Sequence, residues 1–173
     1  MAGLLLARQG VDVIVLEKHP DFLRDFRGDT VHPSTLQVLE ELGLVDEFLK
    51  IRHTKAPAIT MDTAMGPVTF TDFTRLPGRY PYMAFMPQWD VLNFLAEAGR
   101  RYPSFRLVQG ALVTGLVKGG GQVTGVTADT PDGPVEIAAK LVIAADGRQS
   151  AMRGEAGLRT AKASHRWTRC GSG

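Results

Sequence analysis

The sequence predicts an α/β fold, and three observations carry that prediction. The chain opens with a helix-like stretch that ends at Gly10 and is followed at once by a short, β-branched, apolar segment, 11–17. A second apolar segment, 141–145, ends in Asp146 and Gly147. Helical and strand periods alternate between the two segments. Because such short apolar segments are typical of strands covered on both faces of a parallel sheet, we expect both to be buried strands.

The composition agrees with one globular domain and excludes several classes of protein. The 173 residues are 44% apolar and 22% charged, and this length predicts about one domain. No apolar run approaches the roughly 18 residues of a membrane-spanning helix, so we expect no membrane partner and a cytoplasmic location. The single cysteine, Cys170, excludes a disulfide framework and a zinc-finger cluster. The histidines lack metal-ligand spacing, so we expect no metal site.

The net charge of +2 comes from the end of the chain. Residues 159–173 show neither helical nor strand period and contain one large apolar residue, Trp167, so we expect a disordered tail. Without the basic residues of this tail, 16 basic residues face 18 acidic ones, and the body is mildly acidic. A basic body that would indicate a nucleic-acid partner is therefore absent. The basic residues of the tail are Arg159, Lys162, Arg166 and Arg169.

The elements between the two apolar segments follow from periodicity and from glycine and proline positions. Pro33 suits the first turn of a helix over about 34–42, and a short second helix should follow over 44–51. The period then changes to that of strands. The predicted elements are a hairpin within 57–74, a strand over 82–86, a helix over 87–101, a strand over 105–108, and a three-strand meander over 112–118, 122–129 and 133–139.

Gly3, Gly10 and Glu17 form the first constellation with chemical meaning. In a dinucleotide-binding βαβ unit, an acid ends the second strand about 20 residues after the first phosphate-loop glycine. Its carboxylate accepts hydrogen bonds from ribose hydroxyls, and charge-assisted bonds of this kind are strong. Small residues such as Gly3 and Ala7 would let the helix lie close to the sheet. On these residues alone, an ordinary αβ unit with a surface glutamate stays open as the alternative.

Asp146 and Gly147 form the second constellation, at a strand end of the kind where open α/β sheets bind ligands. Gly147 would let the backbone approach a ligand closely. A helix should open within 148–153, and the amino terminus of a helix favours phosphate. The alternative is a plain strand–turn–helix in which Asp146 is the N-cap.

Four stretches, in this order along the chain, resemble the single-component, flavin-dependent aromatic hydroxylases of the p-hydroxybenzoate hydroxylase and phenol hydroxylase type. Residues 13–18, VIVLEK, resemble the ribose-binding strand of that family, and residues 27–36, RGDTVHPSTL, resemble its arginine-containing segment near the flavin. Residues 86–90, MPQWD, resemble the helix start whose glutamine contacts the flavin. Residues 144–153, AADGRQSAMR, resemble its DG motif, and the whole resemblance covers about 1–158.

The resemblance implies an incomplete FAD/NAD(P)-binding Rossmann-like domain over 1–158, with an inserted β-meander and part of a substrate-domain hairpin at about 57–86. It implies FAD as the cofactor, NAD(P)H as co-substrate, and dioxygen and a small organic molecule, aromatic in type, as the partners. No catalytic side chain is expected, because the cofactor supplies the reaction. The residues implied to bind the cofactor are Glu17, Lys18, Arg27, Gln88, Asp146 and Gly147.

Two family motifs are missing from the chain, namely the GxGxxG phosphate loop and a later Gly-Asp motif. We therefore expect a truncated FAD-binding portion of an NAD(P)H-dependent monooxygenase, with weak FAD binding because loop amides that would hold the pyrophosphate are lost. Two alternatives stay open: a non-catalytic fragment without bound cofactor, and another FAD-dependent oxidoreductase of the same fold. The sequence identifies neither the substrate nor the choice between NADH and NADPH.

Overall fold

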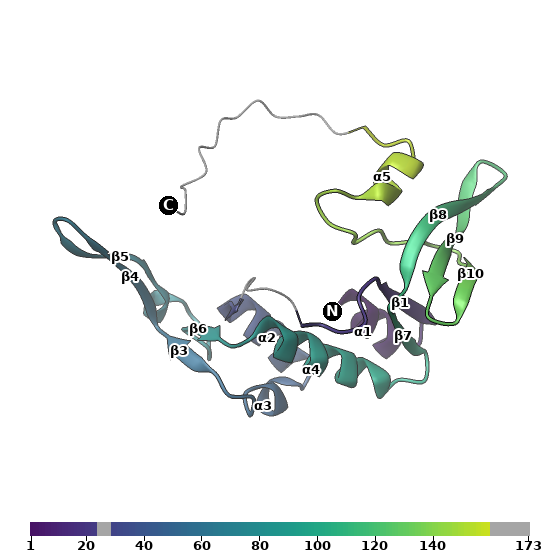
Figure 1. The fold of residues 1–173 in the computed structure, drawn as a ribbon. Helices are drawn as coiled ribbons and strands as arrows, with labels where there is room; N and C mark the ends of the chain where they lie inside the picture. Colours follow the sequence, from purple (N-terminus) through teal and green to yellow (C-terminus); the bar gives the residue numbers. More distant parts are fainter. Residues whose placement is uncertain (24–28, 160–173) are drawn as a thin grey trace. The chain divides into compact units, whose positions relative to one another are not determined.

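The computed structural model describes residues 1–23 and 29–159, and the chain divides into two compact units, Met1–Gln109 and Gly110–Gly173. The first unit, called unit 1, carries most of the helices and several small sheets. The second, called unit 2, carries a three-stranded antiparallel sheet and one short helix in its described part, 110–159 (Figure 1).

Unit 1 begins with the predicted helix and strand. Helix α1 (Ala2–Arg8) is followed by Gly10, whose φ of +76° makes the turn into β1 (Val13–Glu17). Strand β1 pairs in parallel with β7 (Phe105–Gln109), with Glu17 opposite Gln109 at the carboxyl end. This pairing joins two segments about ninety residues apart, and the hydrophobic periodicity of the sequence does not predict it.

Two helices lie close against this strand pair because glycine stands at each contact. A Cβ on Gly3 of α1 would lie 2.6 Å from Val15 Cγ2, and a Cβ on Gly99 would lie 2.8 Å from the Phe105 ring. Gly99 belongs to α4 (Gln88–Arg100), which corresponds to the helix predicted over 87–101. The expectation that small residues bring the first helix close to the sheet is therefore confirmed, and Ala7 is buried as well.

The predicted burial of β1 on both faces is wrong. Val15 packs under α1, but Ile14 points to the opposite face, because side chains alternate along a strand, and it is 43% exposed. Within the described residues β1 has a single neighbouring strand, β7, and no element packs over the face that carries Ile14 closely enough to bury it. One covered face gives half-burial, whatever the composition of the strand.

The main hydrophobic core of unit 1 lies between helices and a small sheet. Helices α2 (Pro33–Glu41) and α3 (Val45–Phe48) correspond to the two predicted helices, and both pack with α4. Leu36 and Phe48 have no exposed surface, and the Phe48 ring meets that of Phe94 edge-on, with centroids 5.1 Å apart. The small sheet has the order β2–β6–β3, all antiparallel. Its strands are β2 (Thr30–Val31), β6 (Met83–Phe85) and β3 (Thr54–Ala56).

The predicted hairpin is present and projects from unit 1 (Figure 1). It consists of β4 (Ala58–Thr63) and β5 (Gly66–Asp72), followed by the 3₁₀ turn η1 (Phe73–Arg75). Several large apolar side chains on it are exposed, among them Met61, Met65 and Phe70.

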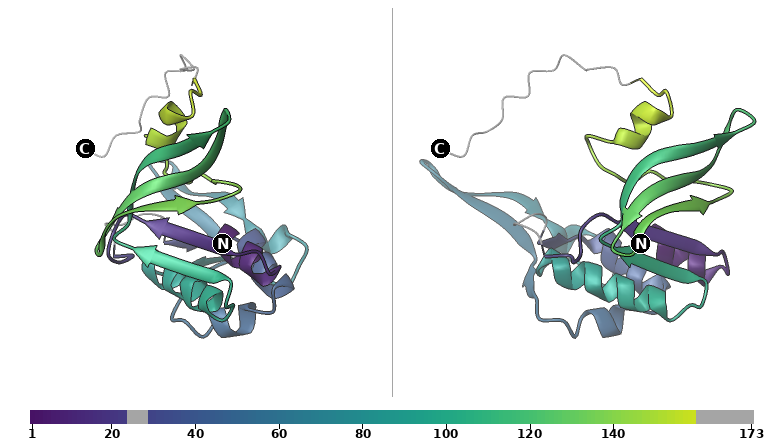
Figure 2. Two further views of the ribbon diagram at one scale, coloured as in Figure 1. Left: turned by 90° about the vertical axis from the view of Figure 1, so that its right-hand side faces the viewer. Right: turned by 45° about the vertical axis from the view of Figure 1, so that its right-hand side comes forward.

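Unit 2 contains the predicted meander. Strands β8 (Leu112–Gly119), β9 (Gln122–Thr130) and β10 (Gly133–Ala138) pair antiparallel in the order β10–β9–β8 (Figure 2). The turn between β8 and β9 uses Gly120 and Gly121, both with positive φ. Helix α5 (Ala151–Glu155) follows later in the chain.

The prediction of a second buried strand over 141–145 is wrong. These residues form no strand, Leu141 is 74% exposed and Ile143 is 59% exposed. A strand is stabilised by hydrogen bonds to a neighbour, and no segment of 1–23 or 29–159 pairs with this one. Without a partner, its apolar composition is insufficient to make a strand.

Candidate functional site

The carboxyl end of the β1–β7 pair gathers several of the residues singled out from the sequence. Glu17 ends β1, and Lys18 follows it directly. Helix α4 packs along β7 in the opposite direction, since its end at Gly99 contacts Phe105, the first residue of β7 (Figure 2). Its start, Gln88, therefore lies toward the carboxyl ends of both strands. Ligands of open α/β sheets bind at this end.

Glu17 is held at the strand end by its own chain. Its side chain is half-buried, and Oε1 accepts a hydrogen bond of 3.0 Å from the backbone N–H of His19. This hydrogen bond holds the carboxylate at the carboxyl end of β1. The next residue, Lys18, is exposed. A carboxylate at this place is an acceptor of the kind that two vicinal hydroxyls require.

Asp29 joins two segments that are far apart in the sequence. Its backbone carbonyl accepts a hydrogen bond of 2.9 Å from the N–H of Met86, and its Oδ1 accepts one of 3.3 Å from the N–H of Gln88. The ladder continues from there, with Thr30 opposite Phe85. The arginine-containing segment and the glutamine segment, both named from the sequence, therefore lie side by side at Asp29.

Asp29 was not among the residues singled out from the sequence. The available signal was its position within the stretch 27–36, where it is an acid ahead of the helix that Pro33 begins. Nothing in that stretch indicates that its partner lies 59 residues further along the chain. Arg27, which was singled out, lies outside the described residues.

Asp146 and Gly147 lie in unit 2, in a turn that leads into α5. Asp146 Oδ2 accepts a hydrogen bond of 3.2 Å from the N–H of Met152. A hydrogen bond with the Ser150 side chain, and then the backbone N–H groups of the helix start, hold the pKa of the Asp146 carboxyl below its usual value. Ser150 is the N-cap residue, since its Oγ accepts a bond of 3.1 Å from the N–H of Arg153.

The same turn is closed by backbone geometry and by a guanidinium. Gly147 has a φ of +83°, in the region that favours glycine. The Arg153 guanidinium donates to the carbonyl of Gly147 at 3.2 Å and to that of Arg148 at 3.4 Å. The predicted helix start within 148–153 is thereby confirmed. The implied roles of Asp146 and Gly147 in binding the cofactor stay predictions.

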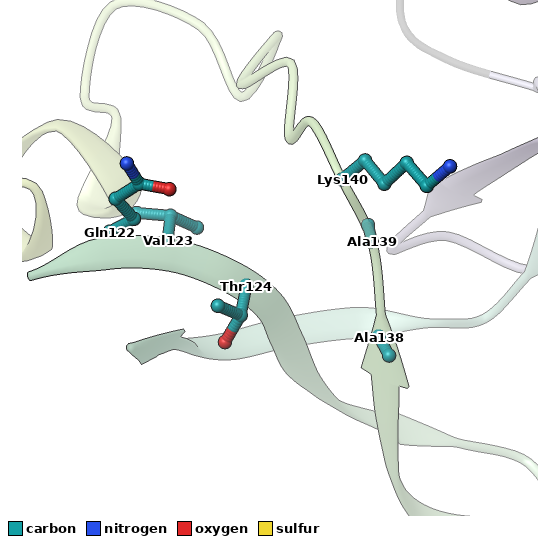
Figure 3. A pocket seen from close by; sticks show the side chains of 6 residues that line it. All are labelled: Gln122, Val123, Thr124, Ala138, Ala139 and Lys140. Atoms are coloured by element: carbon teal, nitrogen blue, oxygen red, sulfur yellow. The ribbon is translucent and has the colours of Figure 1, made fainter. Parts of the chain in front are cut away.

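A hollow of about 550 Å³ lies in unit 2, apart from these residues (Figure 3). It is found where the start of β9 meets the chain after β10, and the N–H of Ala139 donates to the Thr124 carbonyl at 2.8 Å. The Lys140 side chain extends away from the other lining side chains. None of the residues singled out from the sequence lines it, so we assign it no reaction. Its lining residues are Gln122, Val123, Thr124, Ala138, Ala139 and Lys140.

Residues 1–23 and 29–159 offer neither a metal-binding cluster nor a membrane-spanning helix. They contain no group of three or more His, Cys, Asp or Glu side chains arranged to hold a metal ion. They also contain no helix with the length and apolar character needed to cross a membrane.

Residues 1–172 match the family model of the FAD binding domain. The chain belongs to this FAD-binding family. The family inferred from the four stretches is thereby confirmed, and so is FAD as the cofactor of that family. The match runs through both units, so α1, β1, the hairpin, the meander and α5 are all parts of one family pattern.

Curated relatives of this FAD-binding domain are named as monooxygenases or hydroxylases. The chain is 30% identical over 156 residues to 6-methylpretetramide 4-monooxygenase of Streptomyces rimosus, covering 90% of this chain and 37% of that protein. It is 31% identical over 164 residues to 3-(3-hydroxy-phenyl)propionate/3-hydroxycinnamic acid hydroxylase of Burkholderia cenocepacia, covering 93% of this chain and 30% of that protein. The chain thus spans about a third of the length of these two relatives.

Solved structures confirm the mixed α/β fold. The p-nitrophenol 4-monooxygenase of Pseudomonas putida superposes with a TM-score of 0.78 and 28% identity, over 91% of this chain and 40% of that one. A myxobacterial FAD-dependent halogenase superposes with a TM-score of 0.75 over 88% of this chain and 36% of that one. At 22% identity the halogenase shows the fold alone. The fold is therefore shared by flavoproteins of different activity, and the site residues have to decide between them.

Proposed function

We propose that this chain is the FAD-binding portion of an NAD(P)H-dependent flavin monooxygenase that hydroxylates a small aromatic or related organic molecule with dioxygen. The observation that carries the proposal is the junction at Asp29. It joins the arginine-containing and glutamine segments of the hydroxylase pattern within unit 1, which also carries Glu17 at the end of β1. The oxygenase names of the relatives, which match about nine-tenths of the chain, support the same activity.

The donors and acceptors at this edge suit the parts of FAD. Glu17 would accept hydrogen bonds from the ribose hydroxyls of the adenosine, and Lys18 would stand beside it as an exposed cation. The side-chain amide of Gln88 can both donate and accept, which suits the polar edge of a flavin ring. Arg27 would contact the flavin from the neighbouring segment. When bound, FAD supplies the redox chemistry, taking electrons from NAD(P)H and activating dioxygen.

The protein's own contribution would be to bind, orient and exclude water. The half-buried Glu17 would hold the adenosine end of FAD, and the segments joined at Asp29 would hold the flavin end. Asp146 and Gly147 would also bind FAD, with the positive φ of Gly147 leaving room for a close approach of the backbone. No nucleophilic side chain is needed in this scheme.

The same proposal accounts for the organisation of the chain. Residues 1–158 would form a partial FAD-binding domain of Rossmann type, with α1, β1 and β7 as its βαβ-like part. The meander β8–β10 would be an insertion, and the region 57–86 would belong to the substrate side. A cytoplasmic location is part of this proposal as well.

One observation favours a second candidate, a fragment that binds no cofactor. The segment 141–145, which leads to Asp146, is exposed and unpaired within the described residues rather than placed in a sheet. If that strand is needed to hold the turn at Asp146, the present chain would fold without FAD.

Titration of the purified chain with FAD, followed by the quenching of flavin fluorescence, separates the two candidates. We expect weak but saturable binding, and Glu17→Ala should reduce its free energy by about 1–3 kcal/mol, the scale of a hydrogen bond to a charged group. Glu136→Ala is the matched control, since Glu136 is an exposed strand glutamate on β10. Absence of binding by the wild-type chain would favour the second candidate. Equal affinity of Glu17→Ala and wild type would refute the role of Glu17.

A further inference from the structure

Two residues, Met86 and Pro87, connect β6 to Gln88, the first residue of α4, and every backbone N–H group from Met86 to Gln88 has a known acceptor. Met86 and Gln88 each have an N–H, and Pro87 between them has none. Both N–H groups donate to Asp29, that of Met86 to its main-chain carbonyl and that of Gln88 to its carboxylate. One residue therefore takes both donors of the connection.

The start of α4 needs an acceptor from outside the helix. The first N–H groups of a helix have no partner within it, and a side-chain oxygen of the N-cap residue commonly fills this need. Here the N-cap residue is Pro87, which has no such oxygen. The Asp29 carboxylate supplies it from 59 residues away, and its negative charge suits the amino end of a 13-residue helix.

We infer that Asp29 is a positioning residue, which fixes the first residue of α4 and through it the side chain of Gln88. The effect of Asp29 on cofactor binding rests on the proposed function, in which Gln88 contacts the flavin. The hydrogen bonds of Asp29 to Met86 and Gln88 do not depend on that function. Asp29 also directly precedes strand β2, whose residues Thr30 and Val31 pair with β6. A shift of residues 29–31 would therefore move the backbone of Gln88 with it.

Amide hydrogen exchange of the free chain tests the junction without any cofactor. In Asp29→Ala the side-chain acceptor is lost and the main-chain carbonyl is kept. The Gln88 amide should exchange about fivefold faster, as expected for loss of a typical cap, while the Met86 amide should keep its protection. Asp29→Asn keeps an acceptor oxygen of the same shape and should restore most of the protection. Asp72→Ala, which removes the carboxylate that caps the 3₁₀ turn η1, should leave both amides unchanged.

Other outcomes would overturn the inference. Equal acceleration of the two amides would show that Asp29 acts on general stability only, and unchanged exchange at Gln88 would show that its carboxylate holds nothing. If Asp29→Ala does not fold, Asp29→Glu provides the same comparison, because the extra methylene moves the carboxylate while the charge stays.

A double-mutant cycle on FAD affinity then tests the link to the cofactor. If Asp29 acts through Gln88, Asp29→Ala should weaken FAD binding about fivefold. The double variant Asp29→Ala/Gln88→Ala should then bind FAD almost as well as the single variant Gln88→Ala. Additive losses would exclude action through Gln88. Failure of the wild-type chain to bind FAD would refute the proposed function, and the exchange experiment would still decide the junction.

Discussion

Strand β1 and the segment 141–145 have similar sequences and opposite outcomes. Strand β1 has the sequence VIVLE, which is apolar and ends in the acid Glu17. The segment 141–145 has the sequence LVIAA, which is apolar and is followed by the acid Asp146. The first pairs with β7 and packs under α1. The second forms no strand, and its Ile143 is 59% exposed. An apolar run thus supplies the side chains of a buried strand, but the hydrogen-bonded neighbour decides whether the strand exists.

The covering helices explain the rest of the difference. On the β1–β7 pair, glycines in α1 and α4 bring both helices into contact with Val15 and Phe105. No described element packs on 141–145 closely enough to bury Leu141, which is 74% exposed. The comparison predicts large effects of substitution at the strand pair and small ones at the exposed segment.

The largest effect is expected for Phe105→Ala, which removes the ring that packs against both Gly3 and Gly99. We expect a loss of about 3 kcal/mol in the free energy of unfolding, because the cavity would lie under two helices that relax only partly. Chemical denaturation followed by circular dichroism measures it. A loss below about 1 kcal/mol would show that the strand pair is not held by these helices.

Gly99→Ala should have the next largest effect, because the new Cβ would lie 2.8 Å from ring atoms of Phe105. Overpacking of this kind costs about 1–3 kcal/mol. The matched control is Gly154→Ala in α5, where a Cβ would meet nothing within 4 Å. Since alanine favours a helix over glycine, the control should be neutral or more stable by up to about 1 kcal/mol. Similar losses in both variants, measured by thermal unfolding, would contradict the close contact.

A smaller effect is expected from acid at the start of α5. Because the pKa of Asp146 is lowered in the folded chain, its hydrogen bonds stabilise the turn at pH values above the ordinary carboxyl pKa. This stabilisation is lost as the pH falls through the lowered pKa. The amide chemical shift of Met152 should therefore change below about pH 4. Asp146→Asn should abolish that change, and an unaltered titration in this variant would assign it to another group.

The smallest effect is expected for Ile143→Ala, at the exposed member of the comparison. The free energy of unfolding should change by no more than about 0.5 kcal/mol, the usual range for a surface substitution. A loss above about 1.5 kcal/mol, measured by denaturation, would show that 141–145 is packed in solution and would restore the prediction of a buried strand.

Local signals in the sequence were sufficient for most elements. Gly10 ends the first helix region, Pro33 opens α2, and the glycines around 119–121 and 133 separate the meander strands, because φ preferences act within a few residues. The hairpin and α4 follow from their periods in the same way. The motif residues identified the family without any structure, and the comparisons confirm that identification.

Contacts between distant residues were decided by the tertiary structure. The pairing of β1 with β7, the half-burial of Ile14, the exposure of Ile143 and the junction of Asp29 with Gln88 have no counterpart in local periodicity. Periodicity describes which side chains share a face, whereas strand formation and capping depend on which backbone groups meet. The sequence by itself therefore determined most of the elements and the family of this protein, and the tertiary structure decided which apolar segment became a strand and which acid holds the start of α4.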